Sequence, residues 1–361
     1  MKKGYLLLAD GQLYEGELHG AEKNVMAELV FTTAMTGYLE TLTDPSYEGE
    51  IVIQTFPTIG NYGVIPEDFE SRRPRLSGYI ARELCQEPSN FRNTGRLEDF
   101  LREQGIPMLT GVDTRALTRK IRSAGVMNAA ILSERPKDIA ALAEELRNLP
   151  FHPSIQDVTA EAVRPAEGKG RYKVVLWDFG AKANIQRELE KRGCAVTVVP
   201  ASATCKEILE LEPDGIMLSN GPGDPADNVD VIRELQELCT YRIPTFGICL
   251  GHQLLALSQG AKTVKLKYGH RGANQPAKDI KTGLSYMTSQ NHGFAVDSDT
   301  LPGNASLRFI NGNDGTCEGV DYTDMPAFTV QFHPEAAGGP LDTRFLFDRF
   351  IALMGGNQSC R

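Results

Sequence analysis

The fold of this chain is decided by one stretch, Gly247-Ile-Cys-Leu-Gly-His-Gln253. The mainly apolar residues 243–248 predict a buried strand, and residues 250–258 have the spacing of a helix. A sharp strand-to-helix turn with one exposed residue at its tip is a nucleophile elbow, and it needs glycines to avoid collisions with neighbouring elements. Free cysteines are usually inert core residues. The glycine frame around Cys249 instead predicts acyl transfer through a thioester.

Length and composition predict a two-domain globular protein. The 361 residues exceed the usual single-domain size, and the composition, 41% hydrophobic and 24% charged, supplies enough apolar side chains for sizeable cores. A net charge of −9 argues against a nucleic-acid partner, because a phosphate backbone requires clustered Lys and Arg. The one short basic cluster, Arg72-Arg-Pro-Arg75, is interpreted as a solvated loop.

The sequence also predicts a cytoplasmic location. It has no apolar run long enough for a membrane span, and its first residues lack the apolar core of a signal peptide. The seven cysteines are an odd number with no C-x-x-C pair, so neither a disulfide framework nor a zinc site is expected. A reducing compartment would keep a reactive thiol usable.

Composition divides the chain into residues 1–150, a linker at 151–171 and residues 172–361. Proline and glycine, which interrupt helices and strands, gather in the linker together with polar residues. The first part has short β-rich runs at 5–8, 28–33 and 50–55 and helical spacing at 97–104 and 114–123. We therefore expect a smaller, β-rich α+β domain at the N-terminus.

The second part alternates between strand and helix patterns. Strands are predicted at 172–177, 195–199, 215–219 and 243–248, and helices at 182–193, 207–211 and 229–238. This alternation predicts a doubly wound, mostly parallel α/β sheet. Functional residues of such sheets lie at the carboxyl ends of the strands, which is where Cys249 falls.

The thiol needs a base, since an ordinary cysteine is only about 3% ionised at neutral pH. The best candidate is His333, which follows a strand-like run at 327–332. Pro334 disfavours a helical conformation before it, so we expect the extended form to continue through Glu335. Residues two apart in a strand share a face, which would let Glu335 orient His333. His252 lies early in the helix, directed away from the turn, and is interpreted as structural.

The backbone N–H of Leu250 is one expected oxyanion donor, and the loop Asn220-Gly-Pro-Gly-Asp-Pro225 could supply another. This loop also matches a G-x-G-x-x-A dinucleotide fingerprint. Its prolines stiffen it, and the next strand ends in the elbow rather than in an acidic residue, so a nucleotide site is disfavoured. The chain contains no G-x-x-x-x-G-K-[ST] loop, and nucleotide hydrolysis has no support.

The elbow sequence, together with the distant His-Pro-Glu, resembles the class I glutamine amidotransferase family over about residues 172–353. The resemblance implies that Cys249 attacks the side-chain amide of glutamine and forms a γ-glutamyl thioester. It also implies that His333 protonates the departing ammonia and then activates water, while Glu335 holds His333.

The N-terminal part is similar to the family of carbamoyl-phosphate synthase small chains. The similarity lies in Phe31-Thr-Thr-Ala-Met-Thr-Gly-Tyr-Leu-Glu-Thr-Leu-Thr-Asp-Pro-Ser-Tyr47, Gly60-Asn-Tyr-Gly63 and Asp113-Thr-Arg-Ala-Leu-Thr-Arg119. It implies a heterodimer, or a higher oligomer, with a large chain that makes carbamoyl phosphate from ammonia, bicarbonate and ATP for pyrimidine and arginine synthesis. ATP and Mg²⁺ are expected on that large chain, and no cofactor or metal is expected on this one.

The resemblance further implies a set of residues that bind L-glutamine: Ser46, Gly221, Gly223, Leu250, Gln253, Asn291, Gly293 and Phe294. Arg271, Ala273 and Gln275 depart from the family pattern. Three other interpretations remain open: a glutaminase for another synthetase, such as that for anthranilate or guanylate, a γ-glutamyl peptide hydrolase, and a non-catalytic scaffold. The N-terminal domain disfavours the first, and the intact Cys, His and Glu disfavour the last.

Overall fold

The computed structural model describes residues 2–150 and 153–355. They divide into two compact units, with the boundary between Pro153 and Ser154. Part of the predicted linker, residues 151–152, lies outside the described residues. The remainder, from Ser154 on, belongs to the second unit, because Ile155 is buried in its core and the backbone of Arg164 pairs with that of Val198. The polar composition of this stretch therefore marks a surface segment rather than a free linker.

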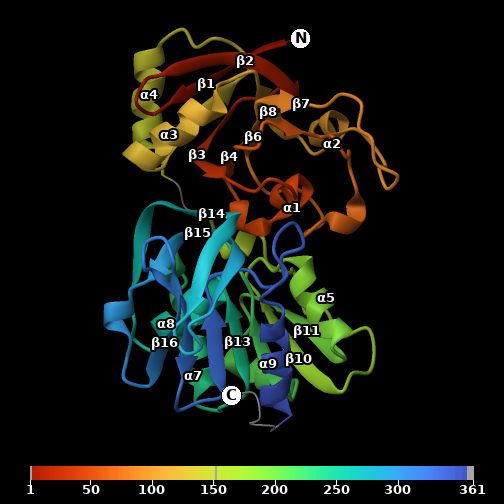
Figure 1. The fold of residues 1–361 in the computed structure, drawn as a ribbon, viewed down its shortest axis with the longest axis vertical. Coiled ribbons are helices and arrows are strands. Elements are labelled where there is room, and N and C mark those ends of the chain that lie inside the picture. Colours follow the sequence, from red (N-terminus) through yellow and green to blue (C-terminus); the bar gives the residue numbers. More distant parts are fainter. Residues whose placement is uncertain (1, 151–152, 356–361) are drawn as a thin grey trace. The chain divides into compact units, whose positions relative to one another are not determined.

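The first unit is a closed β-barrel with the strand order β1-β2-β8-β6-β4-β3-β9 (Figure 1). The barrel strands are β1 (Lys2–Leu8), β2 (Leu13–Gly20), β3 (Val25–Thr32), β4 (Glu50–Gln54), β6 (Gly78–Ile80), β8 (Pro107–Thr110) and β9 (Met127–Leu132). A separate short pair is formed by β5 (Thr58–Ile59) and β7 (Glu83–Leu84). The helices are α1 (Tyr38–Thr43), α2 (Leu97–Glu103), α3 (Thr114–Ala124) and α4 (Ile139–Asn148). The predicted β-rich domain is confirmed.

The second unit contains a nine-stranded sheet with the order β11-β10-β12-β13-β18-β17-β16-β14-β15. Its parallel part comprises β10 (Tyr172–Asp178), β11 (Cys194–Pro200), β12 (Gly215–Leu218), β13 (Thr245–Ile248) and β18 (Ala327–Val330). Antiparallel strands extend it: β14 (Thr263–Asp279), β15 (Ser285–Val296), β16 (Ala305–Asn311) and β17 (Cys317–Tyr322). The helices are α5 (Ala183–Lys191), α6 (Cys205–Glu210), α7 (Val229–Cys239), α8 (Leu250–Ser258) and α9 (Phe345–Met354).

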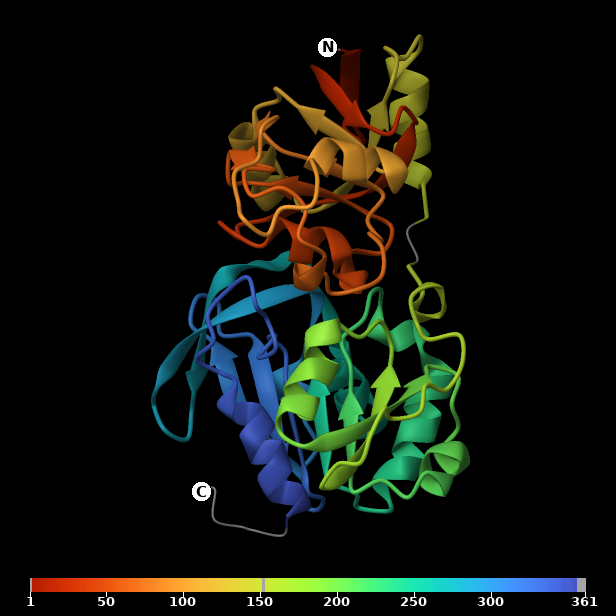
Figure 2. The same cartoon turned by 90° about the vertical axis from the view of Figure 1, so that its right-hand side faces the viewer.

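Helices cover both faces of the parallel part, as Figures 1 and 2 show. Successive residues of β10 point to opposite faces. Val174 and Leu176 pack with α5 and α9, whereas Val175 and Trp177 pack with α7 and α8. Both faces of the strand are thus buried, which explains its continuous apolar sequence. The predicted doubly wound α/β fold is confirmed.

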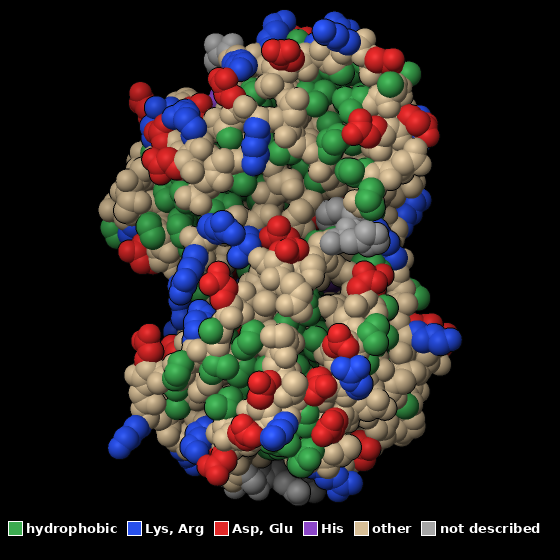
Figure 3. Space-filling model, turned by 180° about the vertical axis from the view of Figure 1, so that it is seen from behind, with side chains coloured by type: hydrophobic (Ala, Val, Ile, Leu, Met, Phe, Trp, Pro, Cys, Tyr) green, Lys and Arg blue, Asp and Glu red, His purple; other side chains and the backbone are tan. Residues whose placement is uncertain are grey.

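On the face that Figure 3 shows, charged side chains of both signs are spread over each unit. In the part of the chain that the structure describes, no helix combines the length and the apolar character needed to cross a membrane.

A cluster of aromatic side chains, formed by Phe246, Phe328, Phe347 and Phe350, packs between the parallel strands and α9 and offers a test of the core. Phe246 stacks on Phe328 with ring centroids 4.4 Å apart and is fully buried. We expect Phe246→Ala to lower the free energy of unfolding by about 3–5 kcal/mol, because it removes a buried ring and leaves a cavity. Urea unfolding followed by the fluorescence of Trp177, the single tryptophan, reports on this unit.

Tyr241→Ala is the control in the same unit, since its side chain is 54% exposed. It should change the free energy of unfolding by no more than about 0.5 kcal/mol. Equal effects of the two substitutions would show that the Phe246 cluster does not stabilise the fold.

Candidate active site

Cys249 lies at the tip of a tight turn between β13 and α8. Its φ of 53° and ψ of −103° lie outside the conformations that L-residues favour. Backbone hydrogen bonds hold the turn: the N–H of Cys249 donates to the carbonyl of Val330 and the N–H of Gly251 to that of Ser219, both at 2.9 Å. The turn has the strained backbone of a nucleophile elbow.

Glycine is required on the helical side of the elbow. A Cβ atom on Gly251 would lie 2.5 Å from the carbonyl oxygen of Leu218. On the strand side, a Cβ on Gly247 would lie 2.9 Å from the Gly251 carbonyl. The helix can therefore approach the strand ends only where both side chains are absent.

Three neighbouring strands of the parallel part, β12, β13 and β18, end at this edge of the sheet. Gly247 of β13 pairs with Leu218 of β12, and Ile248 pairs with Val330 of β18. Because these strands end in register, the segments that follow them start side by side at one edge of the sheet. These segments are Cys249 after β13, the glycine loop after β12 and the stretch after β18. This register brings His333 to the side of the nucleophile, as expected for the carboxyl ends of a parallel sheet.

His333 and Glu335 form a buried pair. Nδ1 of His333 lies 2.7 Å from Oε1 of Glu335, and the side chains are 1% and 0% exposed. The N–H of His333 donates to the Ser289 carbonyl at 2.9 Å. Nε2 of His333 is buried and has no hydrogen-bond partner among the described residues. Because Nδ1 faces the carboxylate, Nε2 is the ring nitrogen left for chemistry.

The expected extended form through Glu335 is wrong. Strand β18 ends at Val330, and Pro334 and Glu335 lie in a turn in which the N–H of Ala336 approaches the His333 carbonyl at 3.3 Å. The proline excludes a helix but does not require a strand. The two side chains meet through this turn instead of through a shared strand face.

Lys182 is a buried third member that the sequence analysis missed. Its Nζ lies 3.5 Å from Oε1 of Glu335. Burial raises the pKa of Glu335, but His333 and Lys182 outweigh it and hold that pKa below the ordinary value. Burial and Lys182 lower the pKa of His333, yet Glu335 and Cys249 raise it above the ordinary value. No local motif marks Lys182, which precedes α5.

Strand β15 runs beside the nucleophile. The thiol of Cys249 contacts the Asn291 carbonyl at 3.6 Å. Nε2 of Gln253 donates to the Phe294 carbonyl at 2.8 Å and to Oε1 of Gln331 at 2.9 Å. Three of the predicted glutamine-binding residues are therefore brought together around Cys249.

The other predicted binding residues are distributed as follows. Leu250 follows the nucleophile at the start of α8, and Gly293 lies in β15 between Asn291 and Phe294. Gly221 and Gly223 lie in the loop after β12, where a Cβ on Gly221 would be 2.2 Å from the Phe179 carbonyl. Ser46 lies in a short 3₁₀ helix of the first unit. Their roles in glutamine binding stay predictions.

His252 is fully buried and its Nδ1 lies 2.7 Å from Oγ1 of Thr329. Burial lowers the pKa of His252 to about 3, so the ring is neutral. This environment agrees with the structural role expected from the sequence.

The fold and the elbow define the second unit as a class I glutamine amidotransferase domain, and residues 175–353 match the family profile "Glutamine amidotransferase class-I". Residues 6–131 match the profile "Carbamoyl-phosphate synthase small chain, CPSase domain". Similar curated proteins include the carbamoyl phosphate synthase small chains of Fusobacterium nucleatum (50% identity over 356 residues, 98% of each chain) and Staphylococcus epidermidis (50% over 356 residues, 98% of this chain and 96% of that one). The small chain of Syntrophotalea carbinolica is 47% identical over 373 residues, 99% of each chain. The chain therefore belongs to the family of carbamoyl-phosphate synthase small chains.

The elbow geometry can be tested with Gly251→Ala. The added methyl group collides with the Leu218 carbonyl and displaces Cys249 from its position. We expect alkylation of the Cys249 thiol, measured by mass spectrometry of its peptide, to become at least about tenfold slower. Gly303→Ala is the matched control, because a Cβ there meets nothing within 4 Å. Unchanged alkylation of Gly251→Ala would contradict the steric argument.

The charges around His333 predict opposite effects of two substitutions. Glu335 raises the pKa of His333 and Lys182 lowers it. Glu335→Gln should therefore lower that pKa relative to the parent protein, and Lys182→Met should raise it. An NMR titration with ¹³C-labelled histidine measures both. Shifts of the same sign in the two variants would refute this electrostatic account.

Proposed function

We propose that this chain hydrolyses L-glutamine to glutamate and ammonia through a γ-glutamyl thioester on Cys249. The observation that carries the proposal is the strained Cys249 elbow beside the buried His333–Glu335 pair, in a chain of the carbamoyl-phosphate synthase small-chain family. The raised pKa of His333 supports it, because an imidazolium beside Cys249 favours the thiolate that attacks.

The first half-reaction forms the thioester. Sγ of Cys249 attacks the side-chain amide carbon of glutamine, and the carbonyl oxygen becomes an oxyanion. The N–H of Leu250 and amides of the loop 220–225 are the proposed donors to this oxyanion, and each such donor stabilises the transition state by about 3 kcal/mol. The C–N bond then breaks as His333 gives a proton to the leaving nitrogen, and ammonia departs.

The second half-reaction releases glutamate. His333 takes a proton from water, the resulting hydroxide attacks the thioester carbon, and the C–S bond breaks with return of a proton to the sulfur. Glu335 keeps Nδ1 of the ring occupied, so Nε2 performs both proton transfers. One water is consumed for each glutamine.

Glutamine recognition is proposed for the residues named in the sequence analysis. The α-carboxylate and α-ammonium of the substrate require amide donors, hydroxyls and carbonyl acceptors. Gln253, Asn291, Gly293 and Phe294 supply such groups from α8 and β15. We assign Gly221, Gly223 and Leu250 to the same set, and the role of Ser46 stays a prediction of the family resemblance.

We further propose that ammonia passes to a large-chain partner, as the term small chain in the relatives' names suggests. In the proposed heterodimer, the large chain binds ATP and Mg²⁺ and combines ammonia with bicarbonate. Ammonia is protonated in bulk water, so an enclosed path between the chains would protect it. The carbamoyl phosphate would serve pyrimidine or arginine synthesis in the cytoplasm. The glutaminase chemistry proposed for this chain would need no cofactor.

Cys249→Ser in the purified complex with the large chain tests the proposal. Carbamoyl-phosphate synthesis driven by glutamine should fall by at least about 10³-fold, because a serine hydroxyl is a far weaker nucleophile here. Synthesis driven by added ammonium should persist. A coupled assay with each nitrogen donor measures both rates.

Cys85→Ser is the control, since it makes the same change at a cysteine of the first unit. It should retain both activities. Retained glutamine-driven synthesis in Cys249→Ser would exclude the thioester. Equal glutaminase rates for the isolated chain and the complex would exclude coupling to the partner.

A further inference from the structure

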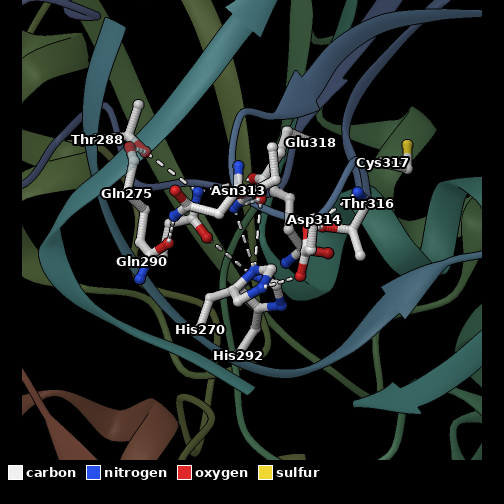
Figure 4. A network of polar contacts seen from close by, with 12 residues as sticks. His270, Gln275, Thr288, Gln290, His292, Asn313, Asp314, Thr316, Cys317 and Glu318 are labelled. Carbon is white, nitrogen blue, oxygen red and sulfur yellow. Dashed lines mark hydrogen bonds and ion pairs between the residues drawn. The ribbon is translucent and has the colours of Figure 1, made fainter. Parts of the chain in front are cut away.

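A second cluster of titratable side chains lies in the antiparallel part of the second unit. It contains His270 of β14, His292 of β15 and Glu318 of β17, whose exposed fractions are 7%, 5% and 0%. Each offers one potential ligand atom, and these atoms lie within 4.8 Å of one another. Figure 4 shows the two imidazole rings side by side below Glu318. The proposed glutaminase chemistry uses none of these side chains.

The hydrogen bonds of His270 determine which of its nitrogens is available. Nε2 lies 2.8 Å from Oδ2 of Asp314. The other oxygen of this carboxylate accepts from the N–H and the hydroxyl of Thr316 at 3.1 and 2.8 Å. Nε2 therefore carries the proton and donates it to Asp314. Nδ1 lies 3.5 Å from Oε1 of Glu318 and 3.4 Å from Nδ2 of Asn311, so either a proton or a metal ion on Nδ1 would be attracted to the carboxylate. Burial lowers the pKa of His270, but the carboxylates of Glu318 and Asp314 outweigh it and raise that pKa above the ordinary value.

His292 presents its second nitrogen in the same way. Nδ1 lies 2.7 Å from the carbonyl oxygen of Phe294, which can only accept, so Nδ1 carries the proton. The lone pair of Nε2 then faces Oε1 of Gln290 at 3.1 Å. In the neutral ring, two lone pairs point at each other in a buried site.

Turning the amide of Gln290 around does not resolve this conflict. Its Nε2 donates to Oε2 of Glu318 at 2.9 Å and to Oγ1 of Thr288 at 3.1 Å. The Thr288 hydroxyl already donates to the Gln275 carbonyl at 2.7 Å. A reversed amide would place its oxygen against both a carboxylate and a hydroxyl oxygen that has no proton left to give. A cation between the facing lone pairs removes the repulsion.

We propose that Nδ1 of His270, Nε2 of His292, Oε1 of Glu318 and Oε1 of Gln290 bind one divalent transition-metal ion of the Zn²⁺ class. Imidazole and carboxylate oxygen are ligands that Zn²⁺ accepts, with bonds of about 2.0–2.2 Å. Neighbouring ligands of a tetrahedral ion are then about 3.3–3.5 Å apart. The separations of 3.1 Å (His292–Gln290) and 3.5 Å (His270–Glu318) are close to that spacing. The ligand atoms of the two histidines and Glu318 lie within 4.8 Å of one another, so binding of the ion would draw them closer together.

The surroundings of the four groups are those of a metal centre. A ligating histidine typically donates its other N–H to a carboxylate or a backbone carbonyl, as His270 does to Asp314 and His292 to Phe294. Glu318 is itself held by Asn311 at 2.8 Å. The carboxylates of Glu318 and Asp314 balance the two charges of the ion.

The ion would have a structural role. It joins β14, β15 and β17, and four protein ligands leave no open position for a substrate. Strand β15 is the strand whose carbonyls accept from Cys249 at Asn291 and from the N–H of His333 at Ser289. The ion would thus fix the strand that borders the nucleophile and its base.

Metal analysis of the full-length protein tests the proposal. The chain is produced without a histidine tag in Zn²⁺-supplemented medium and freed of loose metal by gel filtration. Mass spectrometry of the metal content should then give about one zinc per chain. We expect less than about a tenth of that in Glu318→Gln and in His270→Gln, since each removes one ligand. His19→Gln is the matched control, because His19 is also buried beside a carboxylate, that of Glu98, but lies in the first unit.

A second measurement does not depend on the folding of any variant. The parent protein is unfolded with a chelator and refolded with Co²⁺, which gives strong visible absorption when its coordination is tetrahedral. This absorption should appear and should disappear on competition with Zn²⁺. The midpoint of thermal unfolding should also rise with added Zn²⁺.

Two results would overturn the proposal. One is a parent protein that contains no zinc, gives no cobalt spectrum and has an unfolding midpoint independent of Zn²⁺. A proton on Glu318 with a reversed Gln290 amide would then satisfy the same atoms. The other is full zinc content in His270→Gln and Glu318→Gln, which would place the metal elsewhere.

Discussion

The structure of the second unit depends on one constraint, the strained backbone of Cys249. A non-glycine residue with this conformation costs about 1–3 kcal/mol and persists only where its surroundings impose it. The neighbouring strands do so here through hydrogen bonds to the Val330 and Ser219 carbonyls on either side of the turn. Gly247 and Gly251 then allow the helix to close over the strand end. The position of the thiol is therefore a property of the whole parallel sheet, not of a flexible loop.

Charge balance is the second requirement of the site. Buried ions are tolerated when each has a partner. The Glu335 carboxylate lies 2.7 Å from Nδ1 of His333 and 3.5 Å from Nζ of Lys182, and all three side chains are buried. Burial raises the pKa of Glu335, but attraction to these two neighbours holds that pKa below its ordinary value, and the carboxylate in turn raises the pKa of His333.

Much of the parallel core could be predicted from the sequence, because strands buried on both faces have continuous apolar runs, as in 172–177. The pairing of His333 with Glu335 was predicted for the wrong local reason, since Pro334 begins a turn. The pairing of β14 with β15 is a local hairpin, in which Lys278 pairs with Ser285, but the sequence analysis assigned no strands there. Closure of the first barrel joins strands that are distant in the sequence and has no local signature. The same holds for Lys182, and for the His270–His292–Glu318 cluster, whose members come from three strands. The sequence analysis expected no zinc site because the cysteines lack a C-x-x-C pair. The spacing of cysteines carries no information about a site made of imidazole and carboxylate groups.

The closed barrel of the first unit has a consequence for recognition. Each of its strands is paired on both sides, from β1 round to β9 and back to β1. A ring of this kind offers no free main-chain edge on which a foreign strand could add, so intermolecular β-augmentation and edge-to-edge aggregation have no template there. Whatever docks on the barrel must be selected by side chains and loops. The binding specificity of the barrel can therefore change by substitution of surface side chains, while the hydrogen bonds between its strands stay intact.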